Sequence, residues 1–297
     1  MALAADIASG GKFCDFMAMK SPFPHAYTHN HKVLEDGSVA FECSQDSKIW
    51  PWLNLSPTHQ IVVQTANFWA SVESGMTLGT FDPKKWSALT EVDWTCGSPE
   101  VGRAVRGMYS TDALDDMRRY HLAFYDAEDR RVVKLSGEGV VFKTRDFEGW
   151  RGETKERIVK PGYADGFEFV APAAVGVESE AECFLGPLTH GTPLTANGLI
   201  TKTNGFLPGH PYIGGSGDHV NSTHMGEIGR QMGWLLTGEM IRITEGEMAF
   251  MHYVELGRPF IIDITEHDQR ARNYSFLVRQ ADRDCTRVQM SYALASS

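Results

Sequence analysis

Several features that would assign this chain to a common class are missing from its sequence. Its five cysteines are scattered, odd in number and without a CxxC pair. This pattern does not fit a disulfide framework, and it predicts a protein of a reducing compartment, with the cytoplasm as the expected location. No segment approaches the apolar length of a membrane span, and the first residues lack the pattern of a signal peptide.

Basic residues are also scarce, with 28 Lys and Arg against 38 Asp and Glu and a net charge of −10. That balance argues against a nucleic-acid partner, which needs a surplus of cations facing phosphates. An acidic partner protein would therefore need a local basic patch for docking. Six arginines are candidates for such a patch: Arg103, Arg106, Arg118, Arg119, Arg130 and Arg131.

Motifs for common cofactors and nucleophiles are missing as well. No GxSxG elbow is present, and the glycines at 214, 215 and 217 lack the context of a phosphate-binding loop. His25, His29 and His31 lie close together, but no cysteine or carboxylate completes a metal-binding set. The sequence therefore predicts no metal and no cofactor.

The most informative stretch is residues 217–238, which opens in glycine-rich sequence and closes at Gly238. Apolar residues recur at helical spacing and predict a helix over 219–236. They are Met225, Ile228, Met232, Leu235 and Leu236. Glu227, Arg230 and Gln231 follow one another at i, i+3 and i+4, so their side chains are predicted to lie beside the buried stripe.

A carboxylate beside a buried face has two interpretations. One is an intrahelical Glu–Arg pair at the edge of the core. The other is a site for acid–base chemistry, because Asp218, His219 and His224 cluster just upstream. Histidine, carboxylate, guanidinium and amide would then converge at one helix entrance.

The rest of the chain shows the same order of elements twice. After an irregular lead-in with a strand at 38–43, a buried helix is predicted over 57–72, capped by Ser56 or Thr58. Strands are predicted at 87–96, 103–110, 120–126 and 131–142, with a turn at 127–129. A crossover over 146–187, with a short strand at 166–171, precedes the second copy. There the helix at 219–236 is followed by strands at 240–254, 258–265, 274–280 and 286–293.

A short motif supports this duplication. Glu100-Val101-Gly102-Arg103 and Glu255-Leu256-Gly257-Arg258 each follow the first strand after a helix. Within matching element orders, this repeat predicts two tandem units, residues 1–160 and 161–297, packed together.

A buried helix wrapped by an antiparallel sheet, duplicated in tandem, resembles the hotdog fold. The expected class is α+β, a double hotdog with two long central helices each wrapped by an antiparallel β-sheet. Glu227-Ile228-Gly229-Arg230-Gln231 is similar to the central-helix motif of the β-hydroxyacyl-thioester dehydratases, and Leu207-Pro208-Gly209-His210-Pro211 resembles the loop before it. Asp218-His219-Val220, with Glu227, Arg230 and Gln231, resembles the hotdog family of A-factor (γ-butyrolactone) biosynthesis more closely.

This resemblance implies an enzyme that acts on an acyl chain carried as a thioester on acyl carrier protein or CoA. Dehydration of a β-hydroxyacyl group in fatty-acid or polyketide-type biosynthesis is the first expectation. A condensing acyltransferase of the butyrolactone type is favoured by the Glu–Arg pair, and a non-catalytic binding protein is the third alternative. A homodimer is a possible assembly.

The sequence also departs from the dehydratase pattern. Phe206 or Leu207 stands where those enzymes carry a catalytic histidine, and the first helix offers Gln64 and Asn67 where Glu and Arg are expected. At most one full site per chain is therefore predicted, between the units, with His59 as the cross-unit partner of Glu227. The expected catalytic residues are Glu227, His59 and His219. The expected substrate-binding or orienting residues are Arg230, Gln231, Asp218, His224 and His210.

Overall fold

The computed structural model describes residues 25–82, 85, 87–112, 117–141, 147–201, 204 and 219–295. Within these residues, twelve strands form one sheet in the order β1-β2-β4-β5-β6-β3-β10-β14-β13-β12-β8-β7, and every neighbouring pair is antiparallel. The strands are β1 (Thr28–Val33), β2 (Val39–Cys43), β3 (Ser87–Cys96), β4 (Arg106–Asp112), β5 (Met117–Tyr125), β6 (Arg131–Val141), β7 (Leu185–Thr189), β8 (Thr195–Gly198), β10 (Ile241–Phe250), β12 (Phe260–Asp268), β13 (Asn273–Gln280) and β14 (Arg283–Leu294). Two short strands, β9 (His219–Val220) and β11 (Val254–Glu255), pair separately.

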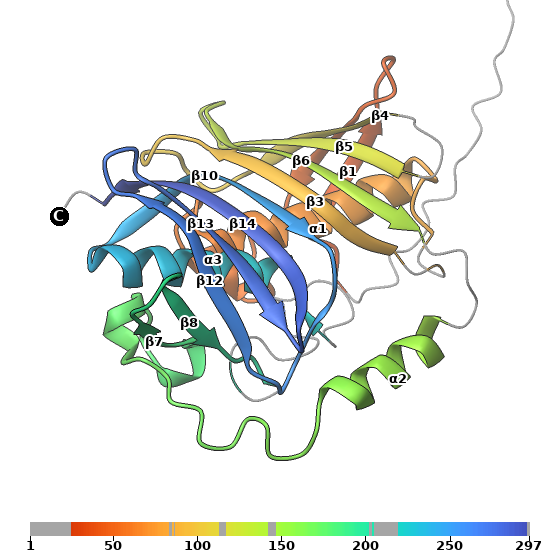
Figure 1. Ribbon diagram of the computed structural model, residues 1–297. Coiled ribbons are helices and arrows are strands. Elements are labelled where there is room, and N and C mark those ends of the chain that lie inside the picture. The colour runs from red at the N-terminus through yellow and green to blue at the C-terminus, as the bar shows by residue number, and fades with distance from the viewer. Residues whose placement is uncertain are drawn as a thin grey trace, which may run out of the picture.

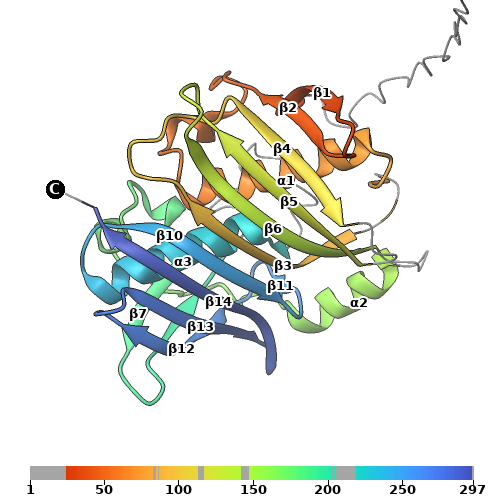
Figure 2. The same ribbon diagram turned by 90° about the horizontal axis from the view of Figure 1, so that it is seen from above.

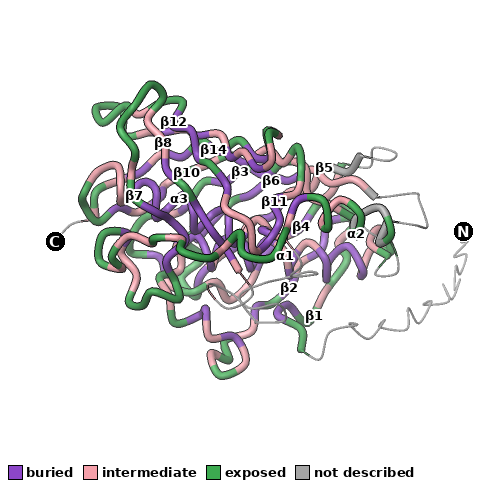
Figure 3. The backbone as a smooth tube through the Cα atoms, turned by 60° about the horizontal axis from the view of Figure 1, so that its bottom comes forward, coloured by how far each residue is buried: buried purple, intermediate pink, exposed green. Residues whose placement is uncertain are grey.

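Two helices, α1 (Gln60–Thr77) and α3 (Ser222–Thr237), lie on one face of this sheet and cross each other (Figures 1 and 2). Both are buried over most of their length, as the purple segments of Figure 3 show. A third helix, α2 (Phe147–Ile158), lies apart from this pair in Figure 1. No helix among the described residues is long and apolar enough to cross a membrane.

The centre of the sheet is the antiparallel pair β3–β10, which joins the first half of the chain to the second. Val92 is paired with Met248, and Trp94 is paired with Gly246. A Cβ atom at Gly246 would lie 2.4 Å from the Trp94 ring, so glycine leaves room for the indole across this junction. The two halves therefore share one continuous sheet.

The strand order has the same pattern on both sides of this junction. In each half, two strands of the main sheet precede the long helix in the chain and lie at the outer edge of that sheet, and the first strand after the helix lies at the centre. The repeated motif occupies matching places: Gly102 lies between β3 and β4, and Gly257 lies between β10 and β12. The local contacts differ, since the Gly102 N–H donates to Asp126 and the Gly257 N–H donates to the Ile200 carbonyl.

Most elements predicted from periodicity are present, with differences at their ends. Helix α1 begins three residues later than predicted, and its N-cap is His59 rather than Ser56 or Thr58. The prediction that the second helix starts at His219 was wrong, because His219 pairs with Glu255 in β9 and Asn221 caps α3. Gly238 does end α3, in the left-handed conformation.

Other differences fall where the sequence pattern is weak. The lead-in is not wholly irregular, since β1 forms an edge of the main sheet beside β2. Helix α2 and strands β7 and β8 were not predicted, and residues 166–171 form no strand. Short edge strands and a polar helix carry little hydrophobic periodicity, which explains these misses.

Candidate active site

Helix α3 brings three polar side chains into the interior. Glu227, Arg230 and Gln231 are 2%, 6% and 0% exposed. The helix starts at a capping box in which Asn221 Oδ1 accepts from the His224 N–H and the His224 ring accepts from the Asn221 N–H. This cap fixes the start of α3. Residues 227, 230 and 231 share one side of the helix because they lie three and four positions apart.

Both oxygens of the Glu227 carboxylate are held by hydrogen bonds. Arg230 Nε donates to Oε2 at 2.9 Å, and Arg230 Nη2 donates to Oε1 at 2.6 Å. Gln231 Nε2 donates to Oε1 at 3.0 Å. This two-point guanidinium clamp sets the plane of the carboxylate and leaves Oε2 with a side open to another group.

That other group comes from the first half of the chain. His59 is the N-cap of α1, where its Nδ1 accepts from the Ile61 N–H at 3.3 Å. Its Nε2 lies 3.9 Å from Glu227 Oε2. Because Nδ1 is an acceptor here, the neutral ring carries its proton on Nε2, the nitrogen that faces the carboxylate. The His59 side chain is 20% exposed, so solvent reaches this end of the pair.

The protonation states of His59 and Glu227 follow from burial and from the neighbouring Arg230. Burial lowers the pKa of His59 to about 4, although the Glu227 carboxylate raises it and Arg230 lowers it further. Burial raises the pKa of Glu227, but Arg230, His59 and Gln231 together hold it below its usual value. Near neutral pH, the pair is therefore a neutral imidazole facing an ionised carboxylate.

Backbone groups of the second half complete the surroundings. Arg230 Nη2 also donates to the carbonyls of Val175 and Gly176, at 3.2 Å each, at the end of the 3-10 helix η2 (Pro172–Val175). Gln231 donates to the Glu182 carbonyl at 2.8 Å and accepts from the Phe184 N–H at 3.0 Å. Arg230 and Gln231 thus fasten the segment before β7 to α3.

The remaining predicted site residues are placed differently. The His219 ring packs edge-on against Tyr253, and His224 lies in the cap of α3. The catalytic role expected of His219 and the substrate-binding or orienting role expected of His224 stay predictions. Asp218, His210, Phe206 and Leu207 lie outside the described residues.

The helix crossing corrects the predicted correspondence between the two halves. Thr65 and Thr223 meet at this crossing, with their hydroxyl oxygens 3.4 Å apart. Glu73 of α1 accepts from the N–H groups of Tyr27 and Thr28, at the start of β1, as Gln231 of α3 accepts from the residue before β7. Both pairs, 65 with 223 and 73 with 231, are separated by 158 positions.

This spacing places Trp69, and not Gln64, at the position of Glu227. The matching of Gln64 and Asn67 with Glu227 and Arg230 was therefore wrong. Asn67 instead accepts from the Tyr120 hydroxyl at 3.0 Å. In this arrangement the first half holds an aromatic ring where the second half holds the carboxylate.

Glu73 is a buried carboxyl that the sequence analysis missed. It is 3% exposed and accepts from the Tyr27 N–H at 3.0 Å, the Thr28 N–H at 2.7 Å and the Thr28 hydroxyl. Burial raises its pKa to about 7, against the opposing effect of these hydrogen bonds. Its helical spacing from Trp69, Val72 and Met76 was a usable signal, since all of them face the core.

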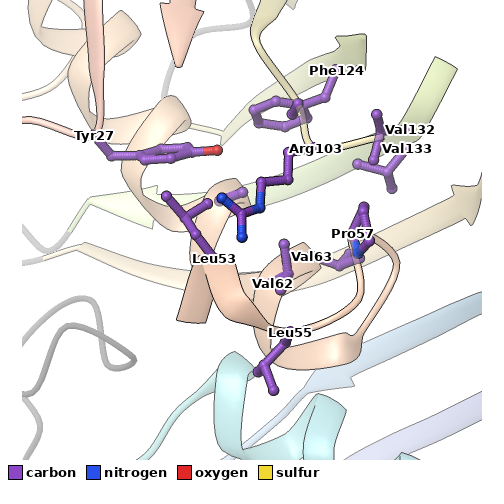
Figure 4. A pocket seen from close by; sticks show the side chains of 12 residues that line it. Tyr27, Leu53, Leu55, Pro57, Val62, Val63, Arg103, Phe124, Val132 and Val133 are labelled. Atoms are coloured by element: carbon purple, nitrogen blue, oxygen red, sulfur yellow. The ribbon is translucent and has the colours of Figure 1, made fainter. Parts of the chain in front are cut away.

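An apolar cavity lies beside α1 (Figure 4). One of its lining residues, Pro57, precedes His59 by two positions in the chain. The Arg103 side chain lies among its apolar side chains in this view. The lining residues are Tyr27, Leu53, Leu55, Pro57, Val62, Val63, Ala66, Arg103, Ala104, Phe124, Val132 and Val133.

Several arginines of the possible basic patch pair with acidic neighbours. Arg106 pairs with Asp129, and Arg130 pairs with Asp126 and Glu128. Arg119 likewise pairs with Asp93 and Glu138. These pairs reduce the positive field that an acidic carrier protein would meet.

No protein-family model matches the sequence, and no curated protein matches it. Solved structures do match. An acyl-ACP thioesterase from Bacteroides thetaiotaomicron has a TM-score of 0.54 at 11% identity, with 86% of this chain and 97% of that chain covered. A structure described as an oleoyl thioesterase from Lactobacillus plantarum has a TM-score of 0.52 at 11% identity, with 82% and 90% covered.

The dehydratase domain of RzxB from Pseudomonas fluorescens has a TM-score of 0.51 at 11% identity, with 91% of this chain and 98% of that domain covered. The narrower resemblance to the A-factor family stays a prediction. At these identities the likeness is one of fold, and it shows that this chain has the hotdog fold.

Proposed function

We propose that this protein is an enzyme acting on an acyl thioester, with Glu227 and His59 at its reaction centre. The observation that carries the proposal is the approach of His59 Nε2 to Glu227 Oε2 at 3.9 Å across the two halves of the chain. Two of the solved structures that share the fold are described as thioesterases, which supports this class of substrate. CoA and acyl carrier protein are both candidate carriers of the acyl group.

Hydrolysis is the reaction that the charges favour. A carboxylate kept ionised by Arg230 can accept a proton from water, whereas dehydration needs an acid to protonate the departing hydroxyl. A thiol of pKa near 8.5 leaves as a thiolate with little help from an acid. The site therefore suits thioester hydrolysis better than the dehydration expected from sequence.

In the proposed step, water loses a proton to Glu227 Oε2 while its oxygen attacks the thioester carbonyl carbon. The C–S bond then breaks, the acyl group becomes a carboxylic acid, and the thiolate takes up the proton that Glu227 holds. The His59 Nε2–H orients the water or the carbonyl oxygen. The N-terminus of α1, which begins beside His59, favours the negative charge that develops on that oxygen.

The apolar cavity beside α1 is lined by Pro57, two residues before His59, and by Val62 and Val63 on the first turns of the same helix, but its volume of about 20 Å³ has room for about one water molecule. The acyl chain is therefore not assigned to this cavity.

Dehydration remains a second candidate, since the RzxB dehydratase domain shares the fold. The condensing reaction has less support, because Arg230 Nε and Nη2 already donate to Glu227 and to two backbone carbonyls. A non-catalytic binding protein is the outcome if no thioester is turned over.

We also propose that the chain is a double hotdog, with α1 and α3 as central helices and units close to 1–160 and 161–297. The mirrored strand order about β3–β10 and the shared spacing of 158 positions support this duplication. Because His59 comes from one unit and Glu227 from the other, such a duplication would build one site from two halves. Homodimer formation stays a prediction.

Turnover assays on the purified protein test the reaction. Saturated and β-hydroxyacyl CoA thioesters are supplied, free thiol is measured with a chromogenic thiol reagent, and enoyl thioester is measured by its ultraviolet absorbance. Thiol release by the wild type that is strongly reduced in Glu227→Asp would support hydrolysis. The aspartate variant is chosen because it keeps a negative charge for Arg230. Enoyl formation without thiol release would assign the protein to dehydration. No product from any thioester would make a non-catalytic binding protein the outcome. Full activity in both Glu227→Asp and Glu227→Gln would remove Glu227 from catalysis.

A further inference from the structure

A chain of hydrogen bonds leads from the buried carboxyl of Glu73 to a histidine on the edge strand β1. Glu73 Oε2 accepts from the Thr28 hydroxyl, and the same hydroxyl oxygen lies 2.9 Å from His31 Nε2. Glu73 and Thr28 are 3% and 1% exposed, whereas His31 is half-buried. No described residue bonds the second ring nitrogen of His31, Nδ1. The three side chains thus connect the interior beside α1 with the edge of the sheet.

The single proton of the Thr28 hydroxyl gives this chain two possible directions. The hydroxyl can donate to Glu73 or to His31, but not to both. An ionised Glu73 only accepts, so Thr28 donates to it and His31 Nε2 donates to Thr28. A protonated Glu73 must donate, and its other partners, the N–H groups of Tyr27 and Thr28, are themselves donors. Glu73 then donates to Thr28 Oγ1, Thr28 donates to His31 Nε2, and a neutral His31 carries its proton on Nδ1.

We propose that Thr28 and His31 form a proton relay to Glu73, so that the state of this buried carboxyl decides which nitrogen of His31 carries the proton. On protonation, a hydronium ion gives a proton to His31 Nδ1, Nε2 gives its proton to Thr28 Oγ1, and Thr28 gives its own proton to Glu73 Oε2. The chain gains one proton, and both hydrogen bonds reverse. His31 Nδ1 changes from an acceptor to a donor, whatever reaction the protein catalyses.

The surroundings of Glu73 place this change near neutral pH. Burial raises the pKa of Glu73 to about 7, against the hydrogen bonds from Thr28 and Tyr27. The titratable groups that face it are Tyr27 and the Cys43 thiol of β2. Burial raises the pKa of Tyr27 well above its usual value and that of Cys43 to about 12, so both are neutral at pH 7. Among the described residues no cation pairs with Glu73, and its charge depends on these hydrogen bonds.

His31 is neutral in the range where Glu73 changes. Burial, and then the neighbouring His29, hold the pKa of His31 below its ordinary value of 6.5. An imidazolium would donate from Nε2 and a protonated Glu73 from Oε2, which leaves the Thr28 hydroxyl proton without an acceptor. The relay therefore holds one added proton and resists a second.

NMR of the full-length protein tests the relay, because a ring nitrogen without a proton resonates far downfield of one that carries a proton. In the wild type, we expect the downfield ¹⁵N resonance of His31 to move from Nδ1 to Nε2 as the pH falls through about 7. The ¹³C shift of the Glu73 carboxyl should change over the same pH range. This measurement needs no variant to fold.

Thr28→Val breaks the chain and keeps the N–H group that donates to Glu73. The change of tautomer near pH 7 should be lost, and the Glu73 carboxyl should titrate at a higher pH, because the hydroxyl that favours its charge is gone. Thr77→Val is the matched control. The Thr77 hydroxyl donates to the backbone carbonyl of Glu73 at 3.0 Å, so this variant leaves the carboxyl with its partners and should keep the change of tautomer.

The proposal is overturned if wild-type His31 keeps one neutral tautomer while Glu73 titrates. It is equally overturned if Glu73 titrates at its ordinary pKa of 4.5, or if the change of tautomer persists in Thr28→Val. Loss of the change in Thr77→Val as well as in Thr28→Val would also overturn it, since any lost hydroxyl near Glu73 would then have the same effect.

Discussion

The hydroxyl oxygens of Thr65 and Thr223 lie 3.4 Å apart at the crossing of α1 and α3. These residues are separated by the same 158 positions as Glu73 and Gln231, which both hold backbone N–H groups at the start of an edge strand. The crossing thereby fixes which residue of one helix corresponds to which residue of the other. Trp69, at the place of Glu227, gives the first half no carboxylate for a second site.

Replacing His59 by Asn separates its two roles. Asn is among the best N-cap residues, so the start of α1 and the melting temperature should be preserved. The imidazole that faces Glu227 is lost, and kcat/KM should fall about 10²- to 10⁴-fold. His59→Ala, as a control, should lose the cap as well, at about 1 kcal/mol in the free energy of unfolding. Normal turnover by His59→Asn would exclude His59 from the reaction centre.

The Glu227–Arg230 pair should behave as a buried ion pair. Its side chains are 3% and 8% exposed, so Glu227→Gln leaves a buried guanidinium without its counter-charge. We expect a loss of about 3–5 kcal/mol in the free energy of unfolding, measured by urea denaturation. Glu227→Gln combined with Arg230→Met should cost less than the sum of the single changes.

The exposed Asp82–Lys85 pair provides the comparison for that prediction. Its side chains are 47% and 63% exposed, and Asp82→Asn should cost less than about 1 kcal/mol. Equal losses at the two pairs would contradict the buried role of Arg230.

The pH dependence of turnover should be flat near neutrality. Burial lowers the pKa of His59 to about 4. Burial raises the pKa of Glu227, but Arg230, His59 and Gln231 together hold it below its usual value, so neither group titrates at neutral pH. The logarithm of kcat/KM should fall only on the acid side, towards pH 4. Because the folded protein binds fewer protons at His59 than the unfolded chain, the stability tied to this group is lost as the pH falls from 6.5 through 4. An acid limb centred near 6.5 would contradict this assignment.

Glu73 should give the opposite dependence of stability on pH. Burial raises its pKa from 4.5 to about 7, so the folded protein binds more protons than the unfolded chain between these values. Stability from this group is complete below pH 4.5 and is lost as the pH rises through about 7. Melting temperatures across this range should show a less steep decline in Glu73→Gln than in the wild type. Parallel curves for the two proteins would contradict the prediction.

Gly176 should tolerate no side chain. Its φ is +62°, and a Cβ atom would lie 2.0 Å from the Trp234 ring, so Gly176→Ala adds a clash to an unfavourable backbone conformation. We expect a loss of about 3 kcal/mol in the free energy of unfolding. Turnover should also fall, because the Gly176 carbonyl helps to hold Arg230. Gly79→Ala is the control, since Gly79 has a φ of +68° with no atom near its Cβ and should cost about 1 kcal/mol.

The sequence predicted the local elements of the site well and their long-range matching less well. The spacing of Glu227, Arg230 and Gln231 predicted a cluster on one side of a helix, and their hydrogen bonds form such a cluster. His59 was expected opposite Glu227, and it lies 3.9 Å away. The prediction that Gln64 occupies the position equivalent to Glu227 was wrong. The helical period is visible in the sequence, but the lengths of the connecting segments do not determine which turns of α1 and α3 meet.

Sequence by itself determined what depends on neighbouring residues: the two buried helices, most of the strands, and the composition of the polar cluster on α3. Helical and strand periods depend only on residues that are close together in the sequence, so these features could be predicted without the rest of the chain. Tertiary structure alone decided the contact of Thr65 with Thr223 and the burial of Glu73 beneath Thr28. Each of these depends on packing between segments far apart in the chain, which local periodicity does not encode.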